Sequence, residues 1–176
     1  MVTTQFKLRF PERELKKWAS QYDYPGEAEL IAGPVAAARR LGYLDMATFM
    51  AIGDWKSPRT RPLRASNAPE FVEEVTRVAL NESSSPRLAI ETLTLLSGVS
   101  WPTASVILHF CHSAPYPIVD FRALWSLSSD VPKQYSYPFW DAYTAFTRSL
   151  ASSLGVDMRT LDRGLWKYSE LHQGAA

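Results

Sequence analysis

The sequence Leu95-Leu-Ser-Gly-Val-Ser-Trp-Pro-Thr-Ala-Ser-Val-Ile-Leu108 is followed, after a short proline-rich link, by Ile118-Val-Asp-Phe-Arg-Ala-Leu-Trp-Ser-Leu127. Apolar residues recur in both parts at helical spacing, and Gly98 interrupts them where a tight turn requires a positive φ angle. The stretch therefore predicts two helices joined by a glycine hairpin, then a loop, then a further helix that begins after Asp120.

Apolar residues three and four positions apart continue through most of the remaining chain. No segment alternates between apolar and polar residues as a half-buried strand does. The pattern predicts an all-α protein of roughly eight to ten short helices. The helical segments are residues 11–22, 27–41 (with a kink expected at Gly33-Pro34), 138–154, and those that follow the capping residues Asp45, Ser85 and Asp157.

The composition is that of an ordinary globular protein, with 176 residues, 46% hydrophobic residues and a formal net charge of +1. The single cysteine, Cys111, permits no intramolecular disulfide and is expected to be a buried thiol. Residues 1–10 do not form the apolar core of a signal peptide, and no run approaches the roughly 18 apolar residues that span a membrane. We expect a soluble, cytoplasmic protein without membrane contact.

A basic segment lies between Asp54 and Glu70, without an acidic residue inside it. Two prolines are expected to prevent a regular helix there. The segment is either a solvated connector or a loop that contacts phosphate, since arginine on an extended backbone suits bidentate phosphate binding. Its four cations are Lys56, Arg59, Arg61 and Arg64.

Asn67 and Glu70, with Pro69 between them, resemble a capping box at the start of the next helix. The apolar residues that this helix is expected to bury are Phe71, Val75, Val78 and Ala79.

The hairpin has the features of an anion-binding turn. Gly98 supplies the positive φ angle, and Val99 turns one apolar side chain back between the helices. Ser100 is expected to cap the second helix, with its hydroxyl accepting from the Thr103 amide and Pro102 tolerated in the first turn. Such a turn points backbone amides outward at a helix N-terminus, where a phosphate oxygen can bind.

The residues Leu96-Ser97-Gly98-Val99-Ser100-Trp101-Pro102-Thr103-Ala104, followed by Val119-Asp120, resemble the helix-hairpin-helix and trailing aspartate of the DNA glycosylase superfamily. The resemblance covers about a fifth of the chain and includes the distance of 18 positions from Pro102 to Asp120. It implies two helical lobes that flank a cleft, with double-stranded DNA as the partner.

The resemblance also implies roles for individual residues. Asp120 would be the catalytic carboxylate that acts on a flipped nucleotide, because the charge that develops on the sugar is positive. Tyr116 and Trp125 would contribute to the base pocket. A monovalent cation would be held by the backbone carbonyls of Thr94, Leu96 and Val99. The DNA-binding residues would be Ser97, Gly98, Val99, Ser100, Trp101 and Thr103, joined by Arg59 and Arg61 of the basic segment.

The chain departs from the family pattern at several positions. Pro102 replaces the lysine of the bifunctional enzymes, Ser100 replaces the second hairpin glycine, and Ser97 replaces the usual proline. The cysteines of an iron–sulfur cluster are absent, so no cofactor is expected to be required; the resemblance allows a monovalent cation at the hairpin. These departures imply a monofunctional glycosylase, if the protein is active at all.

Structural roles compete with these functional ones. Asp120 precedes a helix and is expected to be its N-cap, which is compatible with catalysis. His109 and His112 are spaced as a metal pair, but a third ligand is not evident, so they are assigned to the end of a helix. Trp125 lies among apolar neighbours and is also expected to pack in a core.

The sequence is interpreted as one all-α unit of residues 1–176. Within it, residues 85–130 carry the hairpin and the aspartate, while residues 1–64 and 131–176 complete the second lobe. Three functions remain open: a monofunctional DNA base-excision glycosylase, a non-catalytic helix-hairpin-helix DNA-binding protein, and a helical protein-interaction module with unknown partners.

Overall fold

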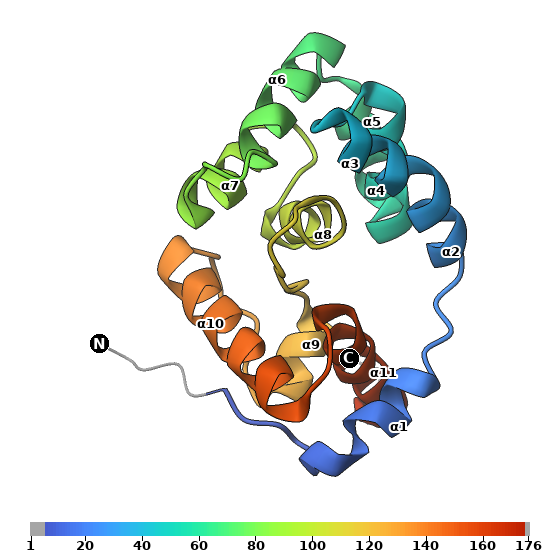
Figure 1. The fold of residues 1–176 in the computed structure, drawn as a ribbon, viewed down its shortest axis with the longest axis vertical. Helices are drawn as coiled ribbons and strands as arrows, with labels where there is room; N and C mark the ends of the chain where they lie inside the picture. Colours follow the sequence, from blue (N-terminus) through green and yellow to red (C-terminus); the bar gives the residue numbers. More distant parts are fainter. Residues whose placement is uncertain (1–5, 175–176) are drawn as a thin grey trace. The chain divides into compact units, whose positions relative to one another are not determined.

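The structure of the protein is a computed structural model that describes residues 6–174. Among these residues it contains helices and no strand, so the predicted all-α class is confirmed (Figure 1). No helix in this range combines the length and the apolar character that crossing a membrane requires. The prediction for residues 1–10 falls partly on residues 1–5, which lie outside the described residues.

The chain forms two compact units. Unit 1 contains residues 6–23 and 115–174, and unit 2 contains residues 24–114. The lobes and the cleft that the resemblance implies, and the grouping of residues 1–64 with 131–176, stay predictions.

Unit 1 is built from four α-helices and a short 3-10 turn. Gly164 allows α11 to approach α1, because a Cβ atom at this position would lie 2.6 Å from the Leu15 side chain. The Trp140 and Tyr143 side chains, on α10, are fully buried. The elements are η1 (Glu12–Glu14), α1 (Leu15–Ser20), α9 (Phe121–Ser126), α10 (Tyr137–Leu154) and α11 (Met158–His172).

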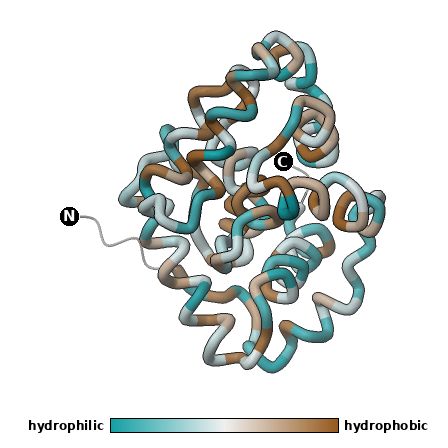
Figure 2. The backbone as a smooth tube through the Cα atoms, turned by 45° about the horizontal axis from the view of Figure 1, so that its top comes forward, coloured by the Kyte–Doolittle hydropathy of each residue, from teal (hydrophilic) through white to brown (hydrophobic). Residues whose placement is uncertain are grey.

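Unit 2 is organised around α8, which packs against α3, α4 and α7. Eight of the eleven residues of α8 are buried, so this helix has no broad solvent face. The elements are α2 (Glu27–Leu30), η2 (Ile31–Val35), α3 (Ala36–Leu41), α4 (Met46–Lys56), η3 (Pro58–Thr60), α5 (Arg61–Ala65), α6 (Pro69–Ala79), α7 (Pro86–Leu93) and α8 (Trp101–Cys111). Hydrophobic and hydrophilic residues alternate along the helices, as expected for amphipathic helices that bury one face (Figure 2).

Most predicted helix starts are confirmed. The carboxylates of Asp45 and Asp157 accept from the amides of Thr48 (2.8 Å) and Thr160 (2.6 Å). The Ser85 hydroxyl accepts in the same way at the start of α7. The kink expected at Gly33-Pro34 is present as the π turn η2, with the proline inside it.

Two predictions for the segment 54–79 are wrong. The basic segment is helical rather than irregular, because Pro58 and Pro62 occupy first-turn positions where the missing amide hydrogen costs little. Helix α6 has Ala68 as its N-cap residue and no capping box, since the Asn67 side chain bonds elsewhere.

The buried face of α6 also differs from the predicted one. Phe71 and Val78 are 39% and 37% exposed, whereas Val72 and Thr76 are buried beside the predicted Val75 and Ala79. The Thr76 hydroxyl donates to the Val72 carbonyl (2.7 Å) and accepts from the Leu44 amide (2.9 Å). A threonine therefore occupies a core position that its polarity alone would not predict.

Candidate functional site

The predicted hairpin is present between α7 and α8. Gly98 has a φ angle of 77°, Val99 is buried, and Ser100 takes the extended N-cap conformation before Trp101. The Ser100 carbonyl accepts from the Ala104 amide at 2.8 Å. The expected bond from the Thr103 amide to the Ser100 hydroxyl is absent, so that prediction is wrong. The serine side chain therefore leaves the Thr103 amide unoccupied.

The Asn67 side chain stabilises the turn through hydrogen bonds to the Ser97 backbone. Its Nδ2 donates to the Ser97 carbonyl (3.0 Å), and its Oδ1 accepts from the Ser97 amide (2.9 Å). Nδ2 also donates to the Arg64 carbonyl at 2.8 Å. The sequence predicts a capping role for Asn67, and no local signal links it to a residue thirty positions away. Ser97 is a predicted DNA-binding residue, and its amide is engaged by the protein itself.

Helix α5 lies directly against the hairpin. A Cβ atom at Gly98 would lie 2.9 Å from the Arg64 backbone nitrogen and 3.1 Å from the Leu63 Cβ atom. Glycine is thus required at this position for the positive φ angle and also for the close approach of α5. The basic segment and the hairpin, which the sequence suggested separately, are neighbours in unit 2.

A buried arginine stabilises this arrangement. The Arg64 side chain is fully buried and donates to the Ser57 carbonyl (3.0 Å), the Thr60 hydroxyl (2.5 Å) and the Asp54 carboxylate (2.6 Å). Burial, together with the charge of Arg61, lowers the pKa of Arg64 from its usual value. Arg64 therefore positions the segment and is not available for a ligand.

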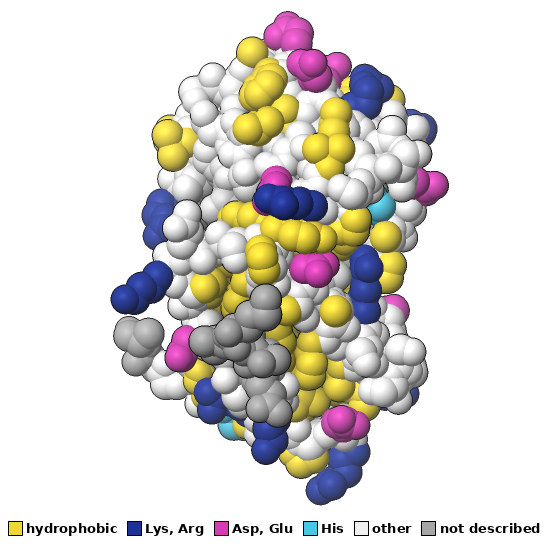
Figure 3. All heavy atoms as spheres, turned by 90° about the vertical axis from the view of Figure 1, so that its left-hand side faces the viewer, with side chains coloured by type: hydrophobic (Ala, Val, Ile, Leu, Met, Phe, Trp, Pro, Cys, Tyr) yellow, Lys and Arg dark blue, Asp and Glu magenta, His cyan; other side chains and the backbone are white. Residues whose placement is uncertain are grey.

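The two arginines predicted to contact phosphate differ in their surroundings. The Arg61 side chain is 58% exposed and forms an ion pair with Asp54. Arg59 is exposed on η3, one turn before α5. Basic and acidic side chains are interspersed over the face drawn in Figure 3, in keeping with the net charge of +1. Any attraction for a polyanion must therefore be local.

The predicted cation ligands lie in the turn before Ser97 and in the hairpin. Thr94 is the C-cap residue of α7, and the Leu96 carbonyl accepts from the Val99 amide at 3.1 Å. The monovalent cation stays a prediction.

Asp120 belongs to unit 1 and caps α9, as expected. Its Oδ1 accepts from the Ala123 amide at 2.9 Å, and the residue is 7% exposed. Burial, with the Asp120 charge as the second cause, raises the pKa of Tyr135 to about 12. Burial, followed by the charges of Asp162 and Asp120, raises the pKa of Tyr143 well above its usual value. The carboxylate thus lies close to two phenols that stay protonated at neutral pH.

The predicted base-pocket residues are packed within unit 1. Tyr116 is buried and stacks on Trp140 with a centroid distance of 5.4 Å, and the Arg148 guanidinium lies 4.7 Å from its ring centroid. Trp125 is half-buried between the Arg9 guanidinium (4.6 Å) and the Tyr168 ring (5.8 Å). Trp125 therefore packs against these neighbours without being buried in the core.

The histidines lie at the end of α8. The Nδ1 atom of the buried His112 accepts from the Ala114 amide at 2.9 Å, and the His109 ring packs on Phe110. Within residues 6–174, no three His, Cys, Asp or Glu side chains are grouped so that they could hold a metal ion.

Comparisons of the chain with protein-family models, with curated proteins and with solved structures find no match. The resemblance to the DNA glycosylase superfamily therefore rests on the hairpin and Val119-Asp120 residues alone.

Proposed function

We propose that the protein binds the phosphate backbone of double-stranded DNA through the hairpin 97–103 and the adjacent basic segment 56–64. The observation that supports this proposal is the contact of α5 with Gly98, because the basic segment and the hairpin, each predicted separately to contact phosphate, are neighbours in unit 2. Either feature alone is common in proteins that bind no nucleic acid.

The hairpin contributes a helix N-terminus. Helix α8 has eleven residues, and its N-terminal end carries partial positive charge and amides without intrahelical partners. The Ser100 hydroxyl makes no cap bond at the start of α8, so a phosphate oxygen would take the capping position there; Thr103 itself is 4% exposed. Asn67 fixes the turn before any ligand arrives, which reduces the ordering cost of binding.

The basic segment contributes the charge. Arg59 is exposed and is the stronger candidate for a phosphate contact, because Arg61 shares its charge with Asp54. Arg64 acts indirectly by holding the segment against the turn.

The test is fluorescence anisotropy of a labelled duplex, measured over a range of salt concentrations. Replacing Arg59 with Gln is expected to weaken binding for all sequences and to reduce the slope of log K against log salt by about one. Arg13→Gln is the matched control, since Arg13 is exposed on η1 of unit 1. Absence of binding by the unaltered protein at low salt would rule the proposal out and favour a protein-interaction module.

Base excision by Asp120 is the second candidate function. The specific observation in its favour is that Asp120 directly follows Val119, opens α9 and is 7% exposed, so its charge acts in a low-dielectric setting. With proline at position 102, the reaction would be monofunctional, without Schiff-base chemistry.

Asp120→Asn tests catalysis without disturbing the fold, because asparagine is an equally good helix cap. The variant is expected to keep its stability and its DNA affinity and to lose the release of bases from modified duplexes, scored as abasic sites. Unchanged base release in this variant would contradict a catalytic role. If the unaltered protein binds DNA but releases no base from any duplex, it is a non-catalytic DNA-binding protein.

A further inference from the structure

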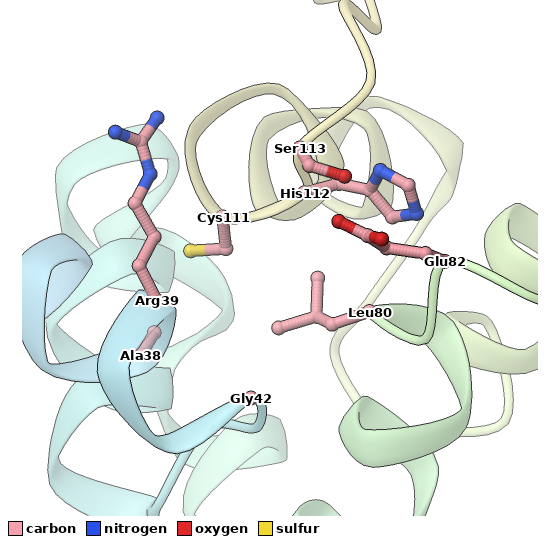
Figure 4. A pocket seen from close by; sticks show the side chains of 8 residues that line it. All are labelled: Ala38, Arg39, Gly42, Leu80, Glu82, Cys111, His112 and Ser113. Atoms are coloured by element: carbon pink, nitrogen blue, oxygen red, sulfur yellow. The ribbon is translucent and has the colours of Figure 1, made fainter.

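A cavity of about 510 Å³ lies inside unit 2, and neither the hairpin nor the basic segment contributes to its lining (Figure 4). This volume is in the range of roughly 300–1,000 Å³ that is typical of small-molecule sites. The floor is buried and the rim is exposed. The floor consists of Ala38, Leu80, Cys111 and His112, and the rim consists of Arg39, Gly42, Glu82 and Ser113.

Three helices end at this cavity. Its lining includes the C-cap residues of α3, α6 and α8, which are Gly42, Leu80 and His112. Helix C-termini carry partial negative charge and carbonyl groups without intrahelical partners. The helix ends therefore favour a positively charged ligand.

Glu82 adds a full negative charge to the same place. Its carboxylate points into the cavity, next to the His112 ring and above Leu80 (Figure 4). Glu82 forms no ion pair or hydrogen bond within residues 6–174, so its charge is not neutralised there. The Glu82 carboxylate adds to the negative potential of the three helix C-termini, and a bound cation would interact favourably with all of them.

Arg39 does not supply that cation. Its Nε atom donates to the Phe110 carbonyl at 2.7 Å, which satisfies one carbonyl at the end of α8. Its guanidinium extends away from Leu80 and Glu82 (Figure 4). The side of the cavity that contains Glu82 consequently remains negative.

Apart from His112, the floor consists of two aliphatic side chains and a thiol. Cys111 is 6% exposed, as expected for a packed thiol, and burial raises its pKa to about 12, with Arg39 opposing the shift. The thiol is therefore protonated at neutral pH. Together with the Leu80 and Ala38 side chains, it offers a surface for an aliphatic stem rather than for a second charge.

We infer that this cavity binds a small organic cation with a primary ammonium head and a short aliphatic stem. The head lies at Glu82, within reach of the Ser113 hydroxyl and of carbonyl groups at the helix ends, and the stem covers Leu80 and Cys111. Three hydrogens on an ammonium group suit several oxygen acceptors at once. The site is independent of the proposed DNA interface.

The test uses three probes with the same stem: hexylammonium, hexanol and hexanoate. Each is titrated into the ¹⁵N-labelled full chain while amide chemical shifts are followed. Hexylammonium is expected to shift amides of residues 38–42, 80–82 and 111–113 and to bind about tenfold more tightly than hexanol, as a charge-assisted hydrogen bond requires. Hexanoate is expected to be the weakest of the three.

Substitutions distinguish recognition of the ammonium head from nonspecific binding of the aliphatic stem. Glu82→Gln is expected to weaken hexylammonium binding about tenfold and to leave hexanol unchanged. Glu12→Gln, the same substitution at an exposed site of unit 1, is expected to change neither. Arg39→Gln removes a nearby cation and is expected not to weaken binding of the ammonium probe.

Three results would overturn the inference. The first is equal binding of hexylammonium and hexanol, which would mean that only the stem is recognised. The second is tightest binding of hexanoate that is lost in Arg39→Gln, which would make the site an anion site. The third is an absence of shifts around the cavity with all three probes.

Discussion

Helices α8 and α9 both begin after an extended N-cap residue, but different contacts stabilise the two helix starts. Ser100 and Asp120 both take an extended N-cap conformation, with ψ angles of 175° and 172°. Asp120 caps its own helix three residues along the chain, at 2.9 Å. The Ser100 side chain makes no such bond, and the turn before α8 is held by Asn67 and α5. An extended N-cap residue is therefore stabilised by a local partner in unit 1 and by distant residues in unit 2.

The difference has a consequence for stability. A cap that bonds within its own helix is affected mainly by substitution of the capping residue. The hairpin depends on its own Gly98 and on a buried arginine and an asparagine from residues 64–67, a segment distant in the sequence. We expect substitutions around the hairpin to cost more than removal of either cap residue, and four experiments measure this contrast.

The largest loss is expected for Arg64→Met. It removes a fully buried guanidinium and leaves the Ser57 carbonyl and the Asp54 carboxylate short of a donor. The free energy of unfolding in urea is expected to fall by about 3–4 kcal/mol. Arg61→Met removes the exposed partner of the same aspartate and is expected to cost less than about 1 kcal/mol. Equal losses in the two variants would show that burial is not what makes Arg64 important.

A smaller loss is expected for Gly98→Ala. Gly42 provides a matched control, because both glycines have a φ angle of 77° but a Cβ atom at Gly42 would meet nothing within 4 Å. Gly42→Ala is expected to cost about 1 kcal/mol, from backbone strain alone. Gly98→Ala is expected to cost about 2–3 kcal/mol, because its Cβ atom would also contact the Arg64 backbone. If urea denaturation gives the same value for both, α5 does not need to approach the hairpin closely.

The third experiment tests the surroundings of Asp120 by pH. The folded-state pKa of Tyr143 is raised, so above pH of about 10 the unfolded chain loses the phenolic proton while the folded protein keeps it. The unfolded state then binds fewer protons, and stability falls by about 1.4 kcal/mol per pH unit for this one group.

Tyr143→Phe is expected to reduce the alkaline slope by that amount. Near neutral pH the variant is expected to lose about 1 kcal/mol, because the hydroxyl no longer donates to the Ile118 carbonyl (2.8 Å in the structure). Urea denaturation at pH 8, 10 and 11 gives both values. An unchanged slope would mean that Tyr143 ionises as readily in the folded protein as in the unfolded chain.

The smallest effects are expected at the caps themselves. Asp120→Ala is expected to lower the unfolding free energy by about 1 kcal/mol, and Asp120→Asn by less than about 0.5 kcal/mol. Ser100→Ala is expected to cost less than about 0.5 kcal/mol, because no side-chain bond is lost. If Ser100→Ala lowers the free energy of unfolding as much as Asp120→Ala does, the two helix starts do not differ in how they are stabilised.

The sequence predicted the features whose partners lie within one helical turn. The caps at Asp45, Ser85, Asp120 and Asp157, the positive φ angle of Gly98 and the all-α class follow from residue type and short spacing. In each case the donor and the acceptor are brought together by helix formation itself, so no tertiary contact has to be known.

The candidate site was predictable only in part, for the same reason. The hairpin residues could be recognised, but Asn67 and Arg64 could not be connected with them, because their contacts with the hairpin join residues thirty or more positions apart. The basic segment was predicted to be irregular, although its prolines fit the first turns of short helices. No feature of the sequence pattern predicted the cavity at the ends of α3, α6 and α8.

By itself, the sequence determined the all-α class, most helix starts and the glycine turn, since local hydrogen bonds and the helical period fix these features. The tertiary structure alone decided that α6 buries Val72 and Thr76, that Arg64 is fully enclosed, and that a cavity forms at three helix ends. A period of about 3.6 residues allows neighbouring faces of a helix to match the apolar pattern almost equally well. Which face is buried, and which distant polar group completes a turn, depends on the elements that pack against it.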